Sequence, residues 1–144
     1  MTRTRVVLAD DLAPVLATVA ALLRDSFDVV AMASDGRAAL EATLKLEPDL
    51  VVLDISMPAM SGIEVAQELK RRGSKARIVF LTVHEDADIL RTCQAAGGLG
   101  YVIKVLMDTD LVLAINQALA GRIFTSRFSS RRDTLRDQRG NPQN

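Results

Sequence analysis

The sequence of 144 residues is poor in aromatic residues and in cysteine. Aromatic side chains make up 3% of it and tryptophan is absent, so a core must be built from Leu, Val, Ile, Ala and Met. The single cysteine, Cys93, cannot form an internal disulfide, which fits a reducing cytoplasm. The formal net charge is zero, so the composition gives no global reason to expect nucleic acid or an anionic membrane as partner.

Long hydrophobic runs are also missing. No run approaches the roughly 20 apolar residues that a membrane-spanning helix needs. The first apolar run, at residues 6–9, is too short for the core of a signal peptide and is followed at once by two aspartates. With 49% hydrophobic and 25% charged residues, the chain has enough apolar material for one globular domain. We therefore expect a soluble, cytoplasmic protein that does not contact the membrane.

Five apolar runs alternate with five segments of helical periodicity. The apolar runs lie at residues 6–9, 27–33, 49–54, 76–82 and 100–104. The helical segments follow them at residues 12–25, 34–48, 62–73, 85–97 and 108–121. The runs are apolar throughout and do not alternate with polar residues, which is typical of parallel strands buried on both faces. The glycine-rich stretch at 97–100 predicts a tight turn from helix to strand. The sequence therefore predicts an α/β fold, a doubly wound parallel sheet with helices on both faces.

Polar residues stand at the ends of four of these predicted strands. They are Asp10, Asp11, Asp54, Thr82 and Lys104. In such sheets ligands bind outside the carboxyl ends of the strands, so we expect these side chains to share one cleft. Crowded carboxylates repel one another unless a cation compensates, and Mg²⁺ prefers oxygen ligands of this kind. A carboxylate beside Mg²⁺, a lysine and a hydroxyl is suited to attack on phosphorus.

Taken together, these motifs resemble the receiver domain of bacterial two-component response regulators over about residues 4–121. The matching motifs are Asp10-Asp11, the block DISMPAMSG at 54–62, Thr82 in FLTVHED, and Tyr101 with Lys104 in AAGGLGYVIK. The resemblance implies a flavodoxin-like, five-stranded sheet of order 2-1-3-4-5. It divides the chain into a receiver domain at 1–121 and a tail at 122–144. The tail carries six arginines against two aspartates and ends in polar residues, so we expect it to be largely disordered.

The resemblance also implies a role for each residue of the cleft. Asp54 would accept a phosphoryl group from the phosphohistidine of a histidine kinase. Asp11, Asp54 and the main-chain carbonyl of Ser56 would ligate Mg²⁺, with Asp10 acting through a bound water. Lys104 would pair first with Asp54 and then with a phosphoryl oxygen. On this reading the chain is a phosphoacceptor and not an enzyme in its own right.

A second group of residues would pass the signal on. Thr82 would move toward the phosphoryl group, and Tyr101 would follow it from an exposed to a buried position. The surface formed by the fourth helix, fifth strand and fifth helix would then change, and a downstream protein or a second copy of the chain would bind there. His84, two residues after Thr82, stands where receivers tune the lifetime of the phosphorylated form.

The tail does not determine what such a switch would act on. The stretch AGRIFTSR at 120–127 resembles the segment that joins a receiver to a helix-turn-helix domain in LuxR-type regulators. Either the chain is a stand-alone receiver, or it is the receiver part of a truncated DNA-binding regulator; direct DNA binding by this chain is not expected. A phosphorylation-independent interaction module is a third alternative. A phosphohydrolase would want a second acid where Ser56 stands.

Overall fold

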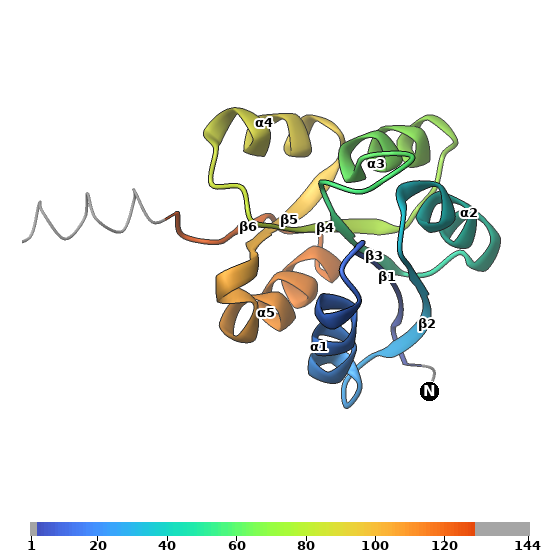
Figure 1. Cartoon of the computed structure of the whole chain (residues 1–144), viewed down its shortest axis with the longest axis horizontal. Helices are drawn as coiled ribbons and strands as arrows, with labels where there is room; N and C mark the ends of the chain where they lie inside the picture. Colours follow the sequence, from blue (N-terminus) through green and yellow to red (C-terminus); the bar gives the residue numbers. More distant parts are fainter. Residues whose placement is uncertain (1–2, 129–144) are drawn as a thin grey trace, which may run out of the picture.

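The computed structural model describes residues 3–128, in which strands and helices alternate along the chain (Figure 1). The strands are β1 (Arg5–Ala9), β2 (Asp28–Ala33), β3 (Leu50–Asp54), β4 (Arg77–Thr82), β5 (Gly98–Ile103) and β6 (Phe124–Thr125). The α-helices are α1 (Ala13–Leu23), α2 (Gly36–Leu46), α3 (Gly62–Arg71), α4 (Ala87–Ala95) and α5 (Met107–Leu119). A single turn of 3₁₀-helix, η1 (Lys104–Leu106), joins β5 to α5.

All strand pairs in the sheet are parallel, and the strand order is β2-β1-β3-β4-β5-β6. The α/β class, the parallel sheet and the order of the first five strands are confirmed. The predicted number of strands is wrong, because β6 adds a sixth at the edge next to β5. A strand of two residues is too short to give a periodic signal in the sequence.

Helices cover both faces of the sheet, as predicted (Figure 1). On one face, Val7 and Val51 pack in a core cluster with residues of α2, α3 and α4. On the other, Val6 and Val52 pack with residues of α1 and α5. Successive strand residues thus enter opposite cores, which is why the strands read as apolar throughout.

The loop after β3 is held close to the end of that strand. A Cβ at Gly62 would lie 2.0 Å from the backbone oxygen of Asp54, so only glycine fits there. The Gly62 N–H donates to the carbonyl of Ile55 over 2.7 Å. Ser61 and Glu64 form a reciprocal capping box that begins α3. These contacts fix the path of the chain immediately after Asp54.

The turn predicted at 97–100 is shorter than expected. Only Gly97 has a left-handed conformation, with φ of 98°, and Gly98 already begins β5. A Cβ at Gly98 would lie 2.6 Å from the ring of Phe80, and one at Gly100 would lie 2.9 Å from Val79. The two glycines of the strand therefore allow close contact with β4 and do not form a turn.

The segment predicted as a tail begins inside the described part of the chain. Residues 122–128 include β6, and Phe128 is only 4% exposed. The remaining residues of the predicted tail, 129–144, lie outside the described residues. Among residues 3–128, no helix has both the length and the apolar character needed to cross a membrane.

Candidate functional site

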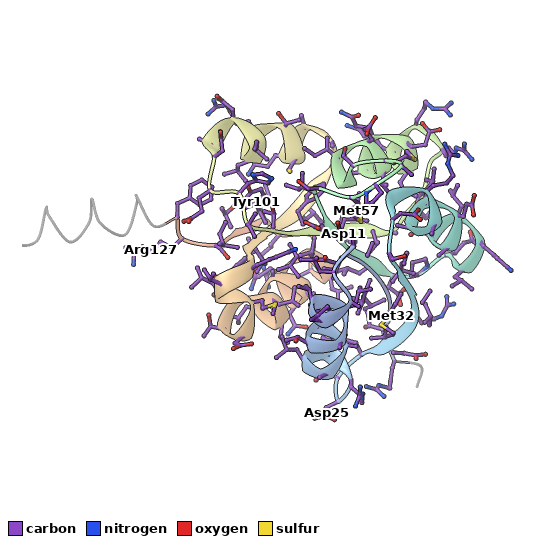
Figure 2. All side chains as sticks on the ribbon, in the orientation of Figure 1. Asp11, Asp25, Met32, Met57, Tyr101 and Arg127 are labelled. Carbon is purple, nitrogen blue, oxygen red and sulfur yellow. The ribbon has the colours of Figure 1, made fainter. Side chains whose placement is uncertain are left out.

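Three carboxylates converge at the carboxyl ends of β1 and β3. Asp54 is the last residue of β3, and Asp10 and Asp11 directly follow β1. One carboxylate oxygen from each of the three lies within 4.8 Å of those of the other two. Asp10 and Asp54 are buried, whereas Asp11 is exposed. Figure 2 shows Asp11 at the start of α1, with Asp25 just beyond the other end of that helix. The cluster predicted from the strand ends is therefore present.

Lys104 lies between two of these acids. It directly follows β5, and its Nζ is 2.8 Å from Oδ2 of Asp10 and 3.5 Å from Oδ2 of Asp54. Its side chain is 12% exposed, so solvent screens these ion pairs only weakly. The lysine is thus shared between two carboxylates and lies nearer to Asp10.

The electrostatic balance leaves the Asp54 carboxyl with a high pKa. Burial is the largest cause and the charge of Asp10 the next, and together they outweigh Lys104 and raise the pKa of Asp54 to about 6. Burial alone would lower the pKa of Lys104, but its contact with Asp10 and the charge of Asp54 raise that pKa above its ordinary value. Lys104 therefore stays charged. The negative charge of Asp54 is only partly compensated by Lys104, so a second cation near Asp54 would be favourable.

The acidic cluster fits a hard divalent cation. Oδ1 of Asp10 accepts a hydrogen bond from the Leu12 N–H over 2.9 Å. Oδ2 of Asp10 is buried and receives no hydrogen bond of good geometry, so the nearby Lys104 ammonium is its compensating charge. Three carboxylates with one under-coordinated oxygen are a donor set suited to Mg²⁺, and the acids could hold a metal ion.

A short hydrogen-bonded path connects Thr82, at the end of β4, with Tyr101 in β5. Thr82, the last residue of β4, is fully buried, and its Oγ1 accepts a hydrogen bond from the His84 N–H over 3.1 Å. The hydroxyl of Tyr101 donates to the His84 carbonyl over 2.8 Å. Tyr101 is 2% exposed and belongs to the core on the α4 side of the sheet (Figure 2), so the exposed position predicted for it before phosphorylation is not the one observed. Burial is the main cause of a Tyr101 pKa well above the ordinary value. The backbone of His84 thus connects the two predicted switch residues.

Ser56 and His84 meet beside the acids. Ser56 is exposed in the loop after β3, and its Oγ is 3.3 Å from Nε2 of His84. The predicted role of the Ser56 main-chain carbonyl as a metal ligand stays a prediction. The contact between the two side chains was not foreseen in the sequence, where the residues are 28 positions apart.

Two residues that follow α5, Ser126 and Phe128, contact Tyr101, and neither was predicted as a site residue. Phe128 packs against Tyr101 in a tilted arrangement, with ring centroids 5.9 Å apart and an interplanar angle of 52°. Ser126 is buried, and its backbone N–H donates to the Tyr101 carbonyl over 2.8 Å. Phe124 and Phe128, the two phenylalanines of the segment after α5, form no periodic pattern that would predict a contact with Tyr101.

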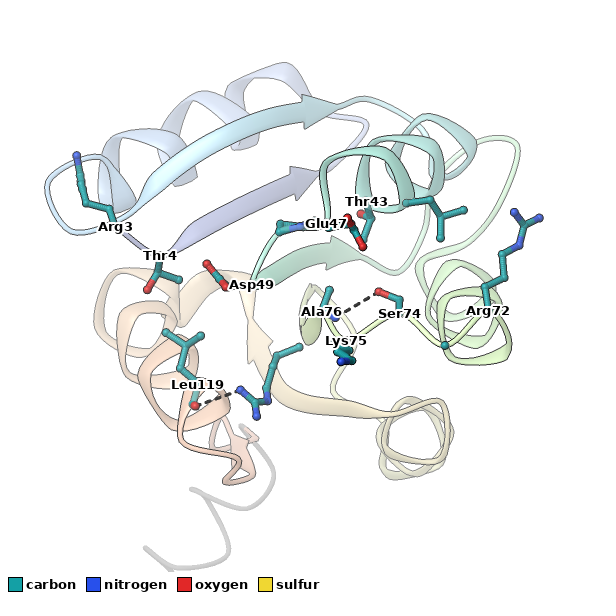
Figure 3. Close-up of a pocket in the computed structure, with 14 residues that line it drawn as sticks. Arg3, Thr4, Thr43, Glu47, Asp49, Arg72, Ser74, Lys75, Ala76 and Leu119 are labelled. Carbon is teal, nitrogen blue, oxygen red and sulfur yellow. Dashed lines mark hydrogen bonds between the residues drawn. The ribbon is translucent and has the colours of Figure 1, made fainter. Parts of the chain in front are cut away.

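A separate groove lies at the opposite ends of the strands (Figure 3). Several of its polar groups are already hydrogen-bonded within the protein. Ser74 accepts a hydrogen bond from the Ala76 N–H over 3.2 Å, and Arg77 donates to the Leu119 carbonyl over 3.2 Å. Asp49 accepts from the Arg5 N–H over 2.8 Å. We assign no site there.

The comparisons with known proteins agree with the geometry. Residues 6–116 match the model of a family described as the response regulator receiver domain. The chain is 34% identical over 143 residues to the uncharacterized transcriptional regulatory protein YvfU of Bacillus subtilis, covering 93% of this chain and 72% of that protein. It is 36% identical over 98 residues to the nitrate/nitrite response regulator NarL of Escherichia coli, covering 68% of this chain but only 45% of NarL.

The fold has a close counterpart among solved structures. The signal receiver domain of the putative response regulator NarL from Mycobacterium tuberculosis superposes with a TM-score of 0.81 at 31% sequence identity. That alignment covers 85% of this chain and all of the other.

Proposed function

We propose that this chain, which belongs to the response regulator receiver domain family, is a phosphorylation-activated switch with Asp54 as its phosphoacceptor. Membership of the family supports a signalling role in a two-component system. The observation that carries the assignment to Asp54 is the convergence of three acids and Lys104 at the strand ends. A phosphohistidine of a histidine kinase is the proposed phosphoryl donor.

Each residue of the cluster has a proposed part. Asp11, Asp54 and the Ser56 carbonyl would hold Mg²⁺, and Asp10 would reach it through a water. When bound, the ion supplies positive charge to the phosphoryl oxygens. Lys104 is already 3.5 Å from Asp54 and would hold a phosphoryl oxygen by a charge-assisted hydrogen bond.

Signal output is proposed to start at Thr82. Its hydroxyl would bond to a phosphoryl oxygen on Asp54 and thereby weaken its contact with the His84 N–H. Because the Tyr101 hydroxyl donates to the His84 carbonyl, a shift of His84 would change how Tyr101 packs. The surface formed by α4, β5 and α5 would then favour a different partner, either a downstream protein or a second copy of the chain.

The proposal is tested by intact-mass measurement after incubation with Mg²⁺ and acetyl phosphate. We expect one phosphoryl adduct in the wild type, none without Mg²⁺, and none in Asp54→Ala. Asp25→Ala is the matched control, because Asp25 is an exposed acid at the far end of α1. An adduct of undiminished yield in Asp54→Ala would refute the assignment. If acetyl phosphate gives no adduct at all, failure of beryllofluoride to bind in the presence of Mg²⁺ would refute it equally.

A further inference from the structure

The residues that follow α5 return to the sheet and cover the edge of β5. Phe124 pairs with Gly100 and Thr125 with Tyr101, in the parallel sense. The Ser126 N–H then continues the ladder to the Tyr101 carbonyl. Figure 1 shows this segment lying beside β5, near α5. We call residues 122–128 the covering segment.

Ser126 fastens the covering segment to two elements at once. Its side-chain oxygen accepts a hydrogen bond from the Ile103 N–H over 3.1 Å. Its hydroxyl donates to Oδ2 of Asp110, on α5, over 2.6 Å. Ser126 is 1% exposed, so these bonds are shielded from water. One small side chain thus links β5, α5 and the covering segment.

Phe128 joins the covering segment to the switch tyrosine. Its ring belongs to the same buried cluster as Tyr101, Leu90 and Cys93, between the sheet and α4. The Tyr101 hydroxyl is in turn bonded to His84, and His84 to Thr82. Tyr101 is therefore held inward by Phe128 on one side and by the His84 carbonyl at its tip.

We propose that residues 122–128 are the resident occupant of the surface formed by α4, β5 and α5, and that they open reversibly. While these residues are bound to β5, the edge of that strand cannot pair with a strand of another protein. Tyr101 also stays buried, although no phosphoryl group is present. An uncovered strand edge is a template for pairing with another chain, so a cover of this kind limits association. Opening is local because the cover pairs through so few residues. The regulatory meaning rests on the proposed function, but the contacts themselves do not.

Tyr101 offers a direct optical test in the full chain, because it is the only tyrosine and tryptophan is absent. We expect Ser126→Ala and Phe128→Ala to raise acrylamide quenching of its fluorescence by at least about threefold. Ile123→Ala is the matched control, since Ile123 lies in the same segment with its side chain 63% exposed. Quenching that stays at the wild-type level in both anchor variants would overturn the proposal.

Amide hydrogen exchange of the wild type tests the opening without any variant. We expect the Ser126 amide to exchange at least about tenfold more slowly than in an unfolded peptide, and at least about tenfold faster than the Val52 amide in the sheet centre. An unprotected Ser126 amide would show that no cover forms. Exchange as slow as that of Val52 would show that the cover does not open separately. Neither experiment uses a phosphodonor, so a failure of phosphorylation at Asp54 would leave this inference standing, and its own failure would leave phosphorylation untouched.

Discussion

The ammonium of Lys104 lies 0.7 Å closer to Asp10 than to Asp54, at 2.8 Å and 3.5 Å. The closer pair is the one that neutralises charge most effectively, since the Coulomb energy falls with distance. Burial and the charge of Asp10 outweigh the more distant Lys104, so the pKa of Asp54 rises to about 6.

Asp54 is expected to reduce the stability of the metal-free protein at neutral pH. The unfolded chain releases the Asp54 proton near pH 3.8, whereas the folded protein keeps it until about pH 6. As the pH rises through this window, the unfolded state loses its proton first, so folding stability falls. In EDTA at pH 7.5, Asp54→Asn should therefore be more stable than the wild type, by about 1 to 3 kcal/mol in urea denaturation. The gain should shrink as the pH falls from 6 to 4. A gain that persists undiminished at pH 4 would contradict the electrostatic cause.

Lys104 is expected to be needed for stability. Without it, Asp10 and Asp54 face each other with no cation between them, and breaking a buried ion pair is costly. Lys104→Met should lower the free energy of unfolding by about 2 kcal/mol at pH 7.5 in EDTA. Lys75→Met, at an exposed lysine, should stay within about 0.5 kcal/mol of the wild type. Equal effects of the two substitutions would mean that the ion pairs do not stabilise the fold.

Mg²⁺ is expected to bind the folded protein through the acidic cluster. A ligand present at tenfold its dissociation constant stabilises the folded state by about 1.4 kcal/mol, because it binds the folded chain alone. Thermal unfolding with increasing Mg²⁺ should show a rising midpoint for the wild type and for Asp25→Asn. The midpoint of Asp11→Asn should respond far less, since one of three carboxylates is lost. An equal response of all three proteins would place the ion elsewhere.

The hydroxyl of Thr82 is expected to matter more than its methyl group. Thr82→Val leaves the His84 N–H without its acceptor at nearly constant volume, and such a loss costs about 1 kcal/mol. Thr82→Ser keeps the acceptor and should retain the wild-type quenching of Tyr101 fluorescence, while Thr82→Val should change it. If Thr82→Ser and Thr82→Val lower the free energy of unfolding in urea to the same extent, the hydrogen bond to the His84 N–H does not account for the effect of Thr82, and this prediction is contradicted.

The convergence of the strand ends could be predicted from the sequence, because in a parallel sheet the carboxyl ends of the strands meet at the same edge regardless of side-chain conformation. Asp10, Asp54, Thr82 and Lys104 each end or follow an apolar run, and this sufficed to predict one shared cleft. Which acid Lys104 approaches more closely depends on side-chain positions in three dimensions. No property of the linear sequence could reveal that difference.

The edge of the sheet next to β5 was the part that the sequence did not predict. Phe128 and Tyr101 are 27 positions apart, and their contact arises only after α5 returns the chain to the sheet. Gly98 and Gly100 were wrongly predicted to form a turn, because glycine is a common turn signal. Both lie inside β5, where Phe80 and Val79 leave no room for a Cβ, so only glycine fits.

The central claim is that Asp54 itself carries the phosphoryl group, and borohydride trapping tests it most directly. After incubation with Mg²⁺ and acetyl phosphate, the acyl phosphate is reduced to homoserine, and the modified residue is located by peptide mass spectrometry. We predict homoserine at position 54 alone. Homoserine at position 10 or 11, with position 54 unmodified, would contradict the account.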